Sequence, residues 1–148
     1  MKRYIILDLD GCIADDRRRL RLIDHAAPDP WVEYHRECEQ DALINPHVAD
    51  LGRKFRPFIF TARPESVRAQ TERWLRNVAR LDVARLFMRP DGCRKPSHVL
   101  KGDYLTLVLL AGVKLNQITF AADDREDVLE VYRKKGITTI LVQGSEVE

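Results

Sequence analysis

Short apolar runs separated by helix-like stretches constrain the fold of this chain more than any other feature. The runs are residues 4–7, 57–61, 86–88, 117–121 and 138–142. Short runs rich in β-branched and aromatic side chains, ending at glycine or polar residues, are typical of buried strands. Between the runs, apolar residues recur at helical spacing within residues 45–54, 64–79, 97–111 and 125–135. Alternating strands and helices predict an α/β domain with a central parallel sheet flanked by helices.

Start and stop signals support the helical stretches. Asn45 before Pro46 predicts an N-cap with proline in the first turn, and Pro64 suits the first turn of the next helix. Gly136, which follows two lysines, predicts the end of the last helix. Trp74 lies on an apolar stripe and is expected in the core.

Residues 12–44 fit the alternation least well. They are polar, with two aspartates and three arginines in succession at 15–19 and two prolines around Asp29. We predict a small, mostly helical insertion above the sheet after the first strand. The length of 148 residues is typical of one domain, so residues 1–148 are expected to fold as a single unit.

Composition places the chain among ordinary globular proteins, with 45% hydrophobic and 32% charged residues and a formal net charge of +2. Three cysteines without C-x-x-C spacing and four scattered histidines predict neither a disulfide scaffold nor a zinc site. The longest apolar stretch, residues 105–113, is shorter than the ~20 residues of a membrane helix. Asp8 and Asp10 interrupt the N-terminal apolar run too early for a signal peptide. We expect a cytoplasmic protein without a membrane partner.

Polar residues follow three of the predicted strands. The first is followed by Asp8 and Asp10, the second ends in Thr61-Ala62-Arg63, and the fourth is followed by Asp123 and Asp124. Ligands of open parallel sheets bind at the carboxyl ends of the strands. Four carboxylates at this edge would repel each other, and an all-oxygen site suits Mg²⁺. The pattern predicts a Mg²⁺ site formed by Asp8, Asp10, Asp123 and Asp124, with a phosphate beside it.

These residues provide a mechanism for phosphoryl transfer. Asp8 can attack phosphorus, while Asp10 donates a proton to the leaving oxygen and later accepts one from water. Thr61 and a lysine would hold the oxygens of the transferring group. An isolated D-x-D is a weak signal, but a strand, D-x-D-G, a second strand with Thr61 and a third with Asp123 and Asp124 are far more specific together. Asp123 and Asp124 could instead cap the helix that follows.

The combination resembles the four motifs of the haloacid dehalogenase superfamily, and most closely the 3′-phosphatase domain of phage polynucleotide kinases. The superfamily motifs are Asp8-Leu9-Asp10-Gly11, Thr61, a downstream lysine and Asp123-Asp124. The closer resemblance rests on Ile44-Asn45-Pro46, Phe60-Thr61-Ala62-Arg63, Val99-Leu100-Lys101 and Asp123-Asp124-Arg125. It covers about residues 4–143 and implies a Rossmann-like domain.

The resemblance implies roles for individual residues. Asp8 would be the nucleophile and Asp10 the acid and base. Lys101 would neutralise Asp8 and the phosphate. Thr61, Ala62, Arg63 and Arg19 would bind substrate, and Asp123 and Asp124 would hold Mg²⁺ directly or through water. The implied activity is a Mg²⁺-dependent phosphomonoesterase that removes a 3′-phosphate from DNA or RNA ends in nucleic acid repair.

Some positions depart from the family pattern. Cys12 replaces the usual threonine, and Ser97 and His98 stand where relatives carry acids before the lysine, so Lys95 remains a rival to Lys101. No G-x-x-x-x-G-K-[ST] motif occurs, so a kinase or ligase partner would be a separate protein. A nucleotidase acting on mononucleotides or another small phosphate ester is the alternative enzyme. A phosphate-binding or kinase-accessory module is the non-enzymatic alternative.

Several signals near the first motif have two interpretations. Cys12 and Arg18 have the C-x₅-R spacing of cysteine phosphatases, but the acids around Cys12 would raise its pKa. The arginines at 17, 18, 19 and 21 form either a solvated helix face or a path for substrate. Trp31 and Tyr34 either stack on a nucleobase or fix the insertion to the sheet.

Overall fold

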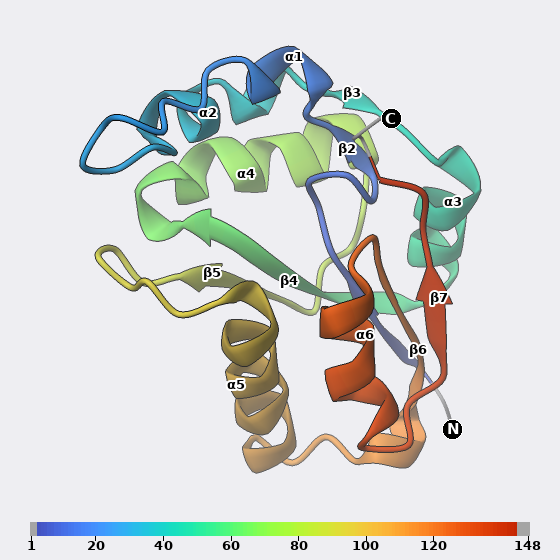
Figure 1. The fold of residues 1–148 in the computed structure, drawn as a ribbon. Coiled ribbons are helices and arrows are strands. Elements are labelled where there is room, and N and C mark those ends of the chain that lie inside the picture. Colours follow the sequence, from blue (N-terminus) through green and yellow to red (C-terminus); the bar gives the residue numbers. More distant parts are fainter. Residues whose placement is uncertain (1–2, 145–148) are drawn as a thin grey trace.

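A five-stranded parallel sheet forms the centre of the computed structural model, which describes residues 3–144 (Figure 1). Its strands are β1 (Tyr4–Leu7), β4 (Arg56–Pro64), β5 (Arg85–Arg89), β6 (Ile118–Asp123) and β7 (Thr139–Leu141). They lie in the order β5-β4-β1-β6-β7, and every pairing is parallel. The predicted α/β fold is confirmed. The order in which strands are added reverses at β1: β4 and β5 lie on one side of it and β6 and β7 on the other. Ligands of such sheets bind at this reversal point.

Helices cover both faces of the sheet. The helices α3 (Pro46–Lys54) and α4 (Arg68–Trp74) lie on one face, and α5 (Ser97–Leu110) and α6 (Glu126–Arg133) lie on the other (Figure 1). The first face buries Trp74 completely, as expected from its apolar stripe. The second buries an aromatic group that includes Phe60 and Tyr132. The two cores fix the sheet between rigid layers, so the strand ends have defined positions.

One predicted helix start was wrong and another was confirmed. Pro64 is not in the first turn of a helix: β4 continues to Pro64 and α4 begins only at Arg68, after a short 3₁₀ turn. Asn45 is the N-cap residue of α3 and is followed by Pro46, as predicted, although Asn45 makes no side-chain capping hydrogen bond. It adopts a left-handed backbone conformation with φ 48°, and its Nδ2 donates hydrogen bonds to the carbonyls of Cys12 (2.8 Å) and Gln143 (3.3 Å). Asn45 therefore connects the loop after β1 with the segment after β7.

The insertion after the first strand forms a small cap above the sheet (Figure 1). Two short antiparallel strands close its base, β2 (Ala14–Asp15) and β3 (Ala42–Leu43). Between them lie α1 (Arg17–Leu20), α2 (Val32–Arg36), a 3₁₀ turn and loops. The cap has less helix than expected, and strands of two residues are too short to show a period in the sequence.

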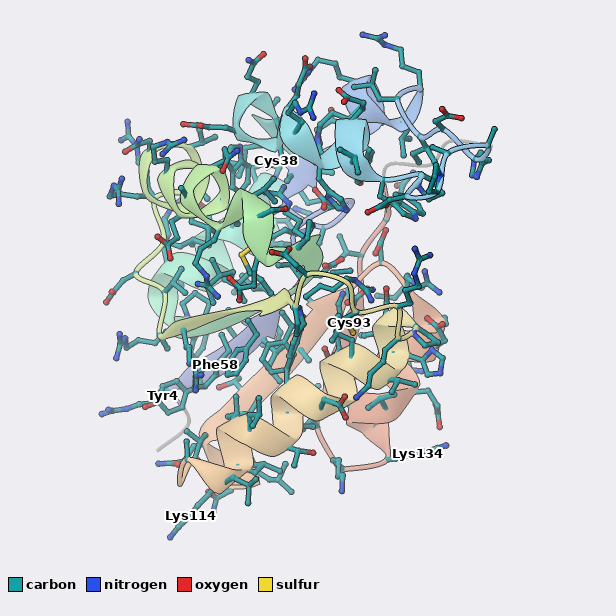
Figure 2. All side chains as sticks on the ribbon, turned by 90° about the vertical axis from the view of Figure 1, so that its left-hand side faces the viewer. Tyr4, Cys38, Phe58, Cys93, Lys114 and Lys134 are labelled. Carbon is teal, nitrogen blue, oxygen red and sulfur yellow. The ribbon has the colours of Figure 1, made fainter. Side chains whose placement is uncertain are left out.

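The three cysteines are free thiols in the structure. Figure 2 shows Cys38 between the cap and α4, whereas Cys93 lies in the loop after β5. Within residues 3–144, no helix combines the length and the apolar character needed to cross a membrane.

Candidate active site

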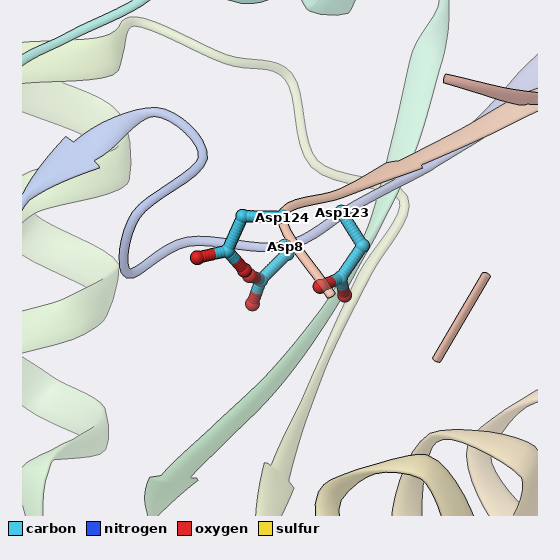
Figure 3. A group of neighbouring side chains, drawn as sticks. All are labelled: Asp8, Asp123 and Asp124. Carbon is cyan, nitrogen blue, oxygen red and sulfur yellow. The ribbon is translucent and has the colours of Figure 1, made fainter. Parts of the chain in front are cut away.

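Three carboxylates meet at the carboxyl ends of β1 and β6 (Figure 3). Asp8 directly follows β1, Asp123 is the last residue of β6, and Asp124 comes next. One oxygen from each lies within 4.8 Å of the others. Asp8 and Asp123 are buried and Asp124 is half-buried, so the group is open to solvent on one side only. The neighbouring strands β1 and β6 place the side chains there because both end at this edge of the sheet.

Lys101 supplies a positive charge to this group from α5. Its buried Nζ donates hydrogen bonds to Asp8 Oδ1 (2.9 Å) and Asp123 Oδ2 (2.6 Å). Lys95, the rival lysine, is exposed and pairs with Asp103 at 2.8 Å. The structure therefore brings Lys101, and not Lys95, to the predicted nucleophile.

One ammonium does not balance three carboxylates. Burial and the charge of Asp123 raise the pKa of Asp8 well above its usual value, although Lys101 opposes the shift. The same causes raise the pKa of Asp124 to about 6. The donor set, three clustered carboxylates with excess negative charge, fits a hard divalent cation such as Mg²⁺.

This charge excess predicts how the melting temperature responds to Mg²⁺. Asp124 titrates near its usual 3.8 when unfolded but near 6 when folded, so stability without Mg²⁺ falls as pH rises between these values. At about pH 5 a bound cation must displace a proton, whereas at about pH 7.5 it relieves repulsion between ionised carboxylates. We expect Mg²⁺ to raise the melting temperature more at the higher pH, as measured by calorimetry. Equal shifts at both pH values would contradict a site at Asp124.

Asp10 stands apart from the three carboxylates, although it was expected beside them. Its oxygens accept hydrogen bonds from Arg63 Nη2 (2.8 Å) and Nε (3.1 Å) and from Arg19 Nη2 (2.6 Å). These contacts direct the Asp10 carboxylate toward the two guanidinium groups, and its predicted metal role stays a prediction. Burial opposes ionisation, but Arg63 and Arg19 outweigh it and hold the pKa of Asp10 well below its usual range.

A second buried acid, Asp41, holds the two arginines in place. Arg19 donates to both oxygens of Asp41, from Nε at 2.8 Å and Nη2 at 2.7 Å, and Arg63 Nη2 lies 3.6 Å away. Both arginine side chains are fully buried. Arg19 and Arg63, predicted to contact substrate, therefore contact Asp10 and Asp41 here. To contact a phosphate, each arginine must either bind it in addition to these carboxylates or give up a hydrogen bond to one of them.

The phosphate-binding candidates on β4 lie beside this network. Thr61 is buried, and its Oγ1 accepts a hydrogen bond from the backbone NH of Arg63 (3.1 Å). Ala62 is half-buried, and its carbonyl accepts from Arg89 Nε at 3.1 Å. The extended backbone of residues 61–64 thus sets the positions of Thr61, Ala62 and Arg63 at the strand end.

The structure adds residues that the sequence analysis missed. Asp41 gave no signal because it lies on a short turn outside every motif. Gly144 passes so close to Asp124 that an added Cβ would lie 2.6 Å from Oδ2. Asp123 also accepts the backbone NH of Arg125 at 3.0 Å, so it organises the start of α6 as well as the carboxylate group.

The contacts of Cys12 and of the arginines bear on two alternatives near the first motif, a cysteine nucleophile and an arginine path for substrate. Cys12 is buried, and burial and then Asp8 raise the pKa of its thiol, so it is no thiolate nucleophile. Arg17 pairs with Asp15 at 2.6 Å, and Arg18 pairs with Glu37 at 2.8 Å. Their charges are largely balanced within the cap, which argues against a path formed by the whole arginine run.

The parallel sheet and the carboxylate group at β1 and β6 are accompanied by a match to a haloacid dehalogenase-type phosphatase domain. A family model of the polynucleotide kinase PNKP phosphatase domain matches residues 2–146. The chain therefore belongs to the PNKP phosphatase-domain family. The predicted resemblance is confirmed.

Solved structures of low sequence identity share the fold. A chain of the Pnkp1/Rnl/Hen1 RNA repair complex has a TM-score of 0.67 at 19% identity, covering 99% of this chain and 44% of that one. A candidate phosphatase from Clostridium difficile has a TM-score of 0.67 at 13% identity, covering 97% and 86%. A haloacid dehalogenase-like hydrolase from Streptococcus pneumoniae has a TM-score of 0.60 at 11% identity, covering 98% and 88%. The chain thus spans less than half of the Pnkp1-complex chain. No curated protein matches it.

Proposed function

We propose that this protein is a Mg²⁺-dependent phosphomonoesterase that removes the 3′-phosphate from DNA or RNA ends through an aspartyl-phosphate. The observation that carries the chemistry is the contact of Lys101 with both Asp8 and Asp123, beside Asp124 at the reversal point of the sheet. The family match supports the choice of a polynucleotide substrate. We further propose that residues 1–148 act as one cytoplasmic phosphatase domain, with residues 12–44 as its cap.

In this mechanism Asp8 Oδ attacks phosphorus and the bond to the ester oxygen breaks. Asp8, Asp123 and Asp124 would hold Mg²⁺, which would supply positive charge beside the transferring phosphoryl group. Lys101 keeps Asp8 oriented and neutralises charge that develops on the phosphoryl oxygens. Water then attacks phosphorus of the aspartyl-phosphate, releasing inorganic phosphate and regenerating the Asp8 carboxylate.

Asp10 moves the protons. With both arginines bound it is an anion, the form needed to accept a proton from the attacking water. To donate a proton to the leaving oxygen it must first be protonated. A bound phosphate dianion competes for Arg19 and Arg63, and weaker pairing to them raises the pKa of Asp10. The arginines thus couple phosphate binding to the protonation of Asp10.

A substrate panel tests the proposed function. A polymer end brings further phosphates near the surface, and such contacts weaken steeply with salt. We expect a higher kcat/KM for a 3′-phosphorylated oligonucleotide than for the matching 3′-mononucleotide, with an advantage that shrinks as salt rises. The measurement is the release of inorganic phosphate at low and high salt, with the 5′-mononucleotide as a third substrate.

Arg21 and Arg17 form a matched pair for this panel. Both are exposed arginines at the ends of α1, but Arg17 is paired with Asp15, whereas Arg21 has no ion-pair partner among residues 3–144. If Arg21 contacts a phosphate of the polymer, Arg21→Gln should lower the ratio of kcat/KM for the oligonucleotide to kcat/KM for the mononucleotide. Arg17→Gln should lower this ratio less. If 5′-mononucleotides are equal or better substrates and salt leaves the ratio unchanged, the enzyme is a nucleotidase instead.

A further inference from the structure

Trp31 is the aromatic ring that the cap leaves uncovered. It is 45% exposed, whereas Tyr34 is 5% exposed and Trp74 is fully buried. Among the described residues, it is the one aromatic member of the exposed large apolar side chains. Tyr34 is buried inside the cap against Arg19 and Asp16, so packing within the cap does not account for the exposure of Trp31.

The Trp31 ring packs against neighbouring aromatic rings, and hydrogen bonds fix the backbone that carries it. It packs edge-on against Tyr34, with ring centroids 5.4 Å apart and planes at 78°. Its backbone NH donates to Asp29 Oδ1 at 3.1 Å, and its carbonyl accepts from the NH of His35 at 3.0 Å. Tyr34 in turn donates to Asp16 through its hydroxyl group. A ring that is already ordered loses little conformational entropy when a ligand stacks on it.

A short chain of contacts connects Trp31 to the proposed acid and base. The guanidinium of Arg19 lies 4.3 Å from the centre of the Tyr34 ring. The same group donates to the Tyr34 carbonyl at 2.7 Å and to Asp10 at 2.6 Å. Trp31 therefore lies one aromatic ring beyond the arginine that contacts Asp10.

Two further features mark the same side of the cap. His35 packs against Trp31 and Tyr34, and its Nδ1 is buried without a hydrogen-bond partner among the described residues. The loop after β5 also reaches this part of the cap, where Arg94 Nη2 donates a hydrogen bond to the Pro28 carbonyl at 3.4 Å. Figures 1 and 2 show the cap loop and the loop after β5 projecting on the same side of the molecule. An aromatic ring with a guanidinium group nearby suits a nucleotide, which has an apolar base and an anionic backbone.

We propose that Trp31 is the stacking platform for the nucleobase of the nucleotide that carries the scissile phosphate. The proposal rests on the proposed function and specifies how the leaving group is recognised. Stacking on one ring tolerates all four bases, since every base has a π-face. The enzyme should therefore require a base at the 3′-end and discriminate weakly between bases.

Matched substrates and variants test this role. The substrates are a 3′-phosphorylated oligonucleotide with a normal terminal base, the same oligonucleotide with an abasic terminal sugar, and a small alkyl phosphate. We expect Trp31→Ala to lower kcat/KM on the base-bearing end by at least about tenfold, because one stacked base contributes on that scale. The loss on the other two substrates should be much smaller, and Trp31→Phe should keep most of the activity. Val32→Ala, an adjacent exposed position, is the control.

Fluorescence provides an independent measurement of stacking. The protein has two tryptophans, of which Trp74 is buried. Binding of the base-bearing oligonucleotide to an Asp8→Asn variant should quench the Trp31 emission, and adding Trp31→Phe should abolish the quenching. Equal losses on all three substrates, or no quenching by an oligonucleotide or a mononucleotide, would overturn the stacking role. If the wild-type protein does not prefer a 3′-phosphorylated end to the alkyl phosphate, the proposed function fails. The stacking role is then tested by mononucleotides alone: quenching of the Trp31 emission would support it, and no quenching would overturn it.

Discussion

Asp8→Asn should reduce kcat by at least about 10³-fold, the scale expected when a covalent nucleophile is lost. The amide cannot attack phosphorus, and it removes one of three carboxylates from the cluster. The thermal stability of Asp8→Asn, in contrast, should not fall. Burial and Asp123 disfavour the Asp8 carboxylate, so the variant without Mg²⁺ should melt at the same or a higher temperature than wild type. Steady-state kinetics and calorimetry on the same preparation measure both effects.

Asp82→Asn is the matched control, because the Asp82 side chain is 86% exposed and pairs only loosely with Arg56, at 3.6 Å on the surface. It should leave both kcat and the melting temperature unchanged. An Asp8→Asn protein that keeps more than about a tenth of wild-type turnover would exclude Asp8 as the nucleophile, because covalent catalysis depends on that atom.

Lys101→Met should destabilise the protein by about 3–5 kcal/mol, since it leaves Asp8 and Asp123 buried without their shared cation. For a domain of this size, such a loss lowers the melting temperature by about 10 °C or more. Activity should fall as well, because Lys101 orients the nucleophile. Mg²⁺ should recover part of the lost stability, since it opposes the same negative charge.

The control for Lys101→Met is Lys95→Met. Lys95 pairs with Asp103 on the surface, and exposed pairs contribute little. We expect no measurable change in melting temperature or turnover. Similar effects of the two substitutions would show that Lys101 has no special relation to the carboxylates.

The sequence predicted the sheet and its helices because their patterns are local. A buried parallel strand requires a continuous apolar run, and each flanking helix requires a stripe, so residues 4–7 and 97–111 were recognisable without tertiary information. The strand-end carboxylates Asp8 and Asp123 followed from the topology, since parallel strands end at one edge.

The missed features depend on contacts between distant segments. Asp41 belongs to the site only because the cap folds back and lets Arg19 contact it together with Asp10. The contacts of Asp10 could not be predicted for the same reason, since its carboxylate accepts a hydrogen bond from Arg63, which lies far along the chain. Asn45 is the predicted N-cap residue of α3, but its side chain donates to the carbonyls of residues 12 and 143, contacts that the local sequence does not reveal.

The buried position of Arg19 has a consequence for the catalytic cycle. Arg19 belongs to the cap, yet its guanidinium is fully enclosed between Asp10 from the sheet loop and Asp41 at the base of the cap. Swinging the cap outward would separate these charges in a solvent-poor interior, which is costly. A turnover without lid opening has no conformational step that limits its rate, unlike enzymes whose lids must reopen to release product. The maximal rate would then be set by the chemical steps or by release of inorganic phosphate, and added phosphate should inhibit competitively because it binds the free enzyme.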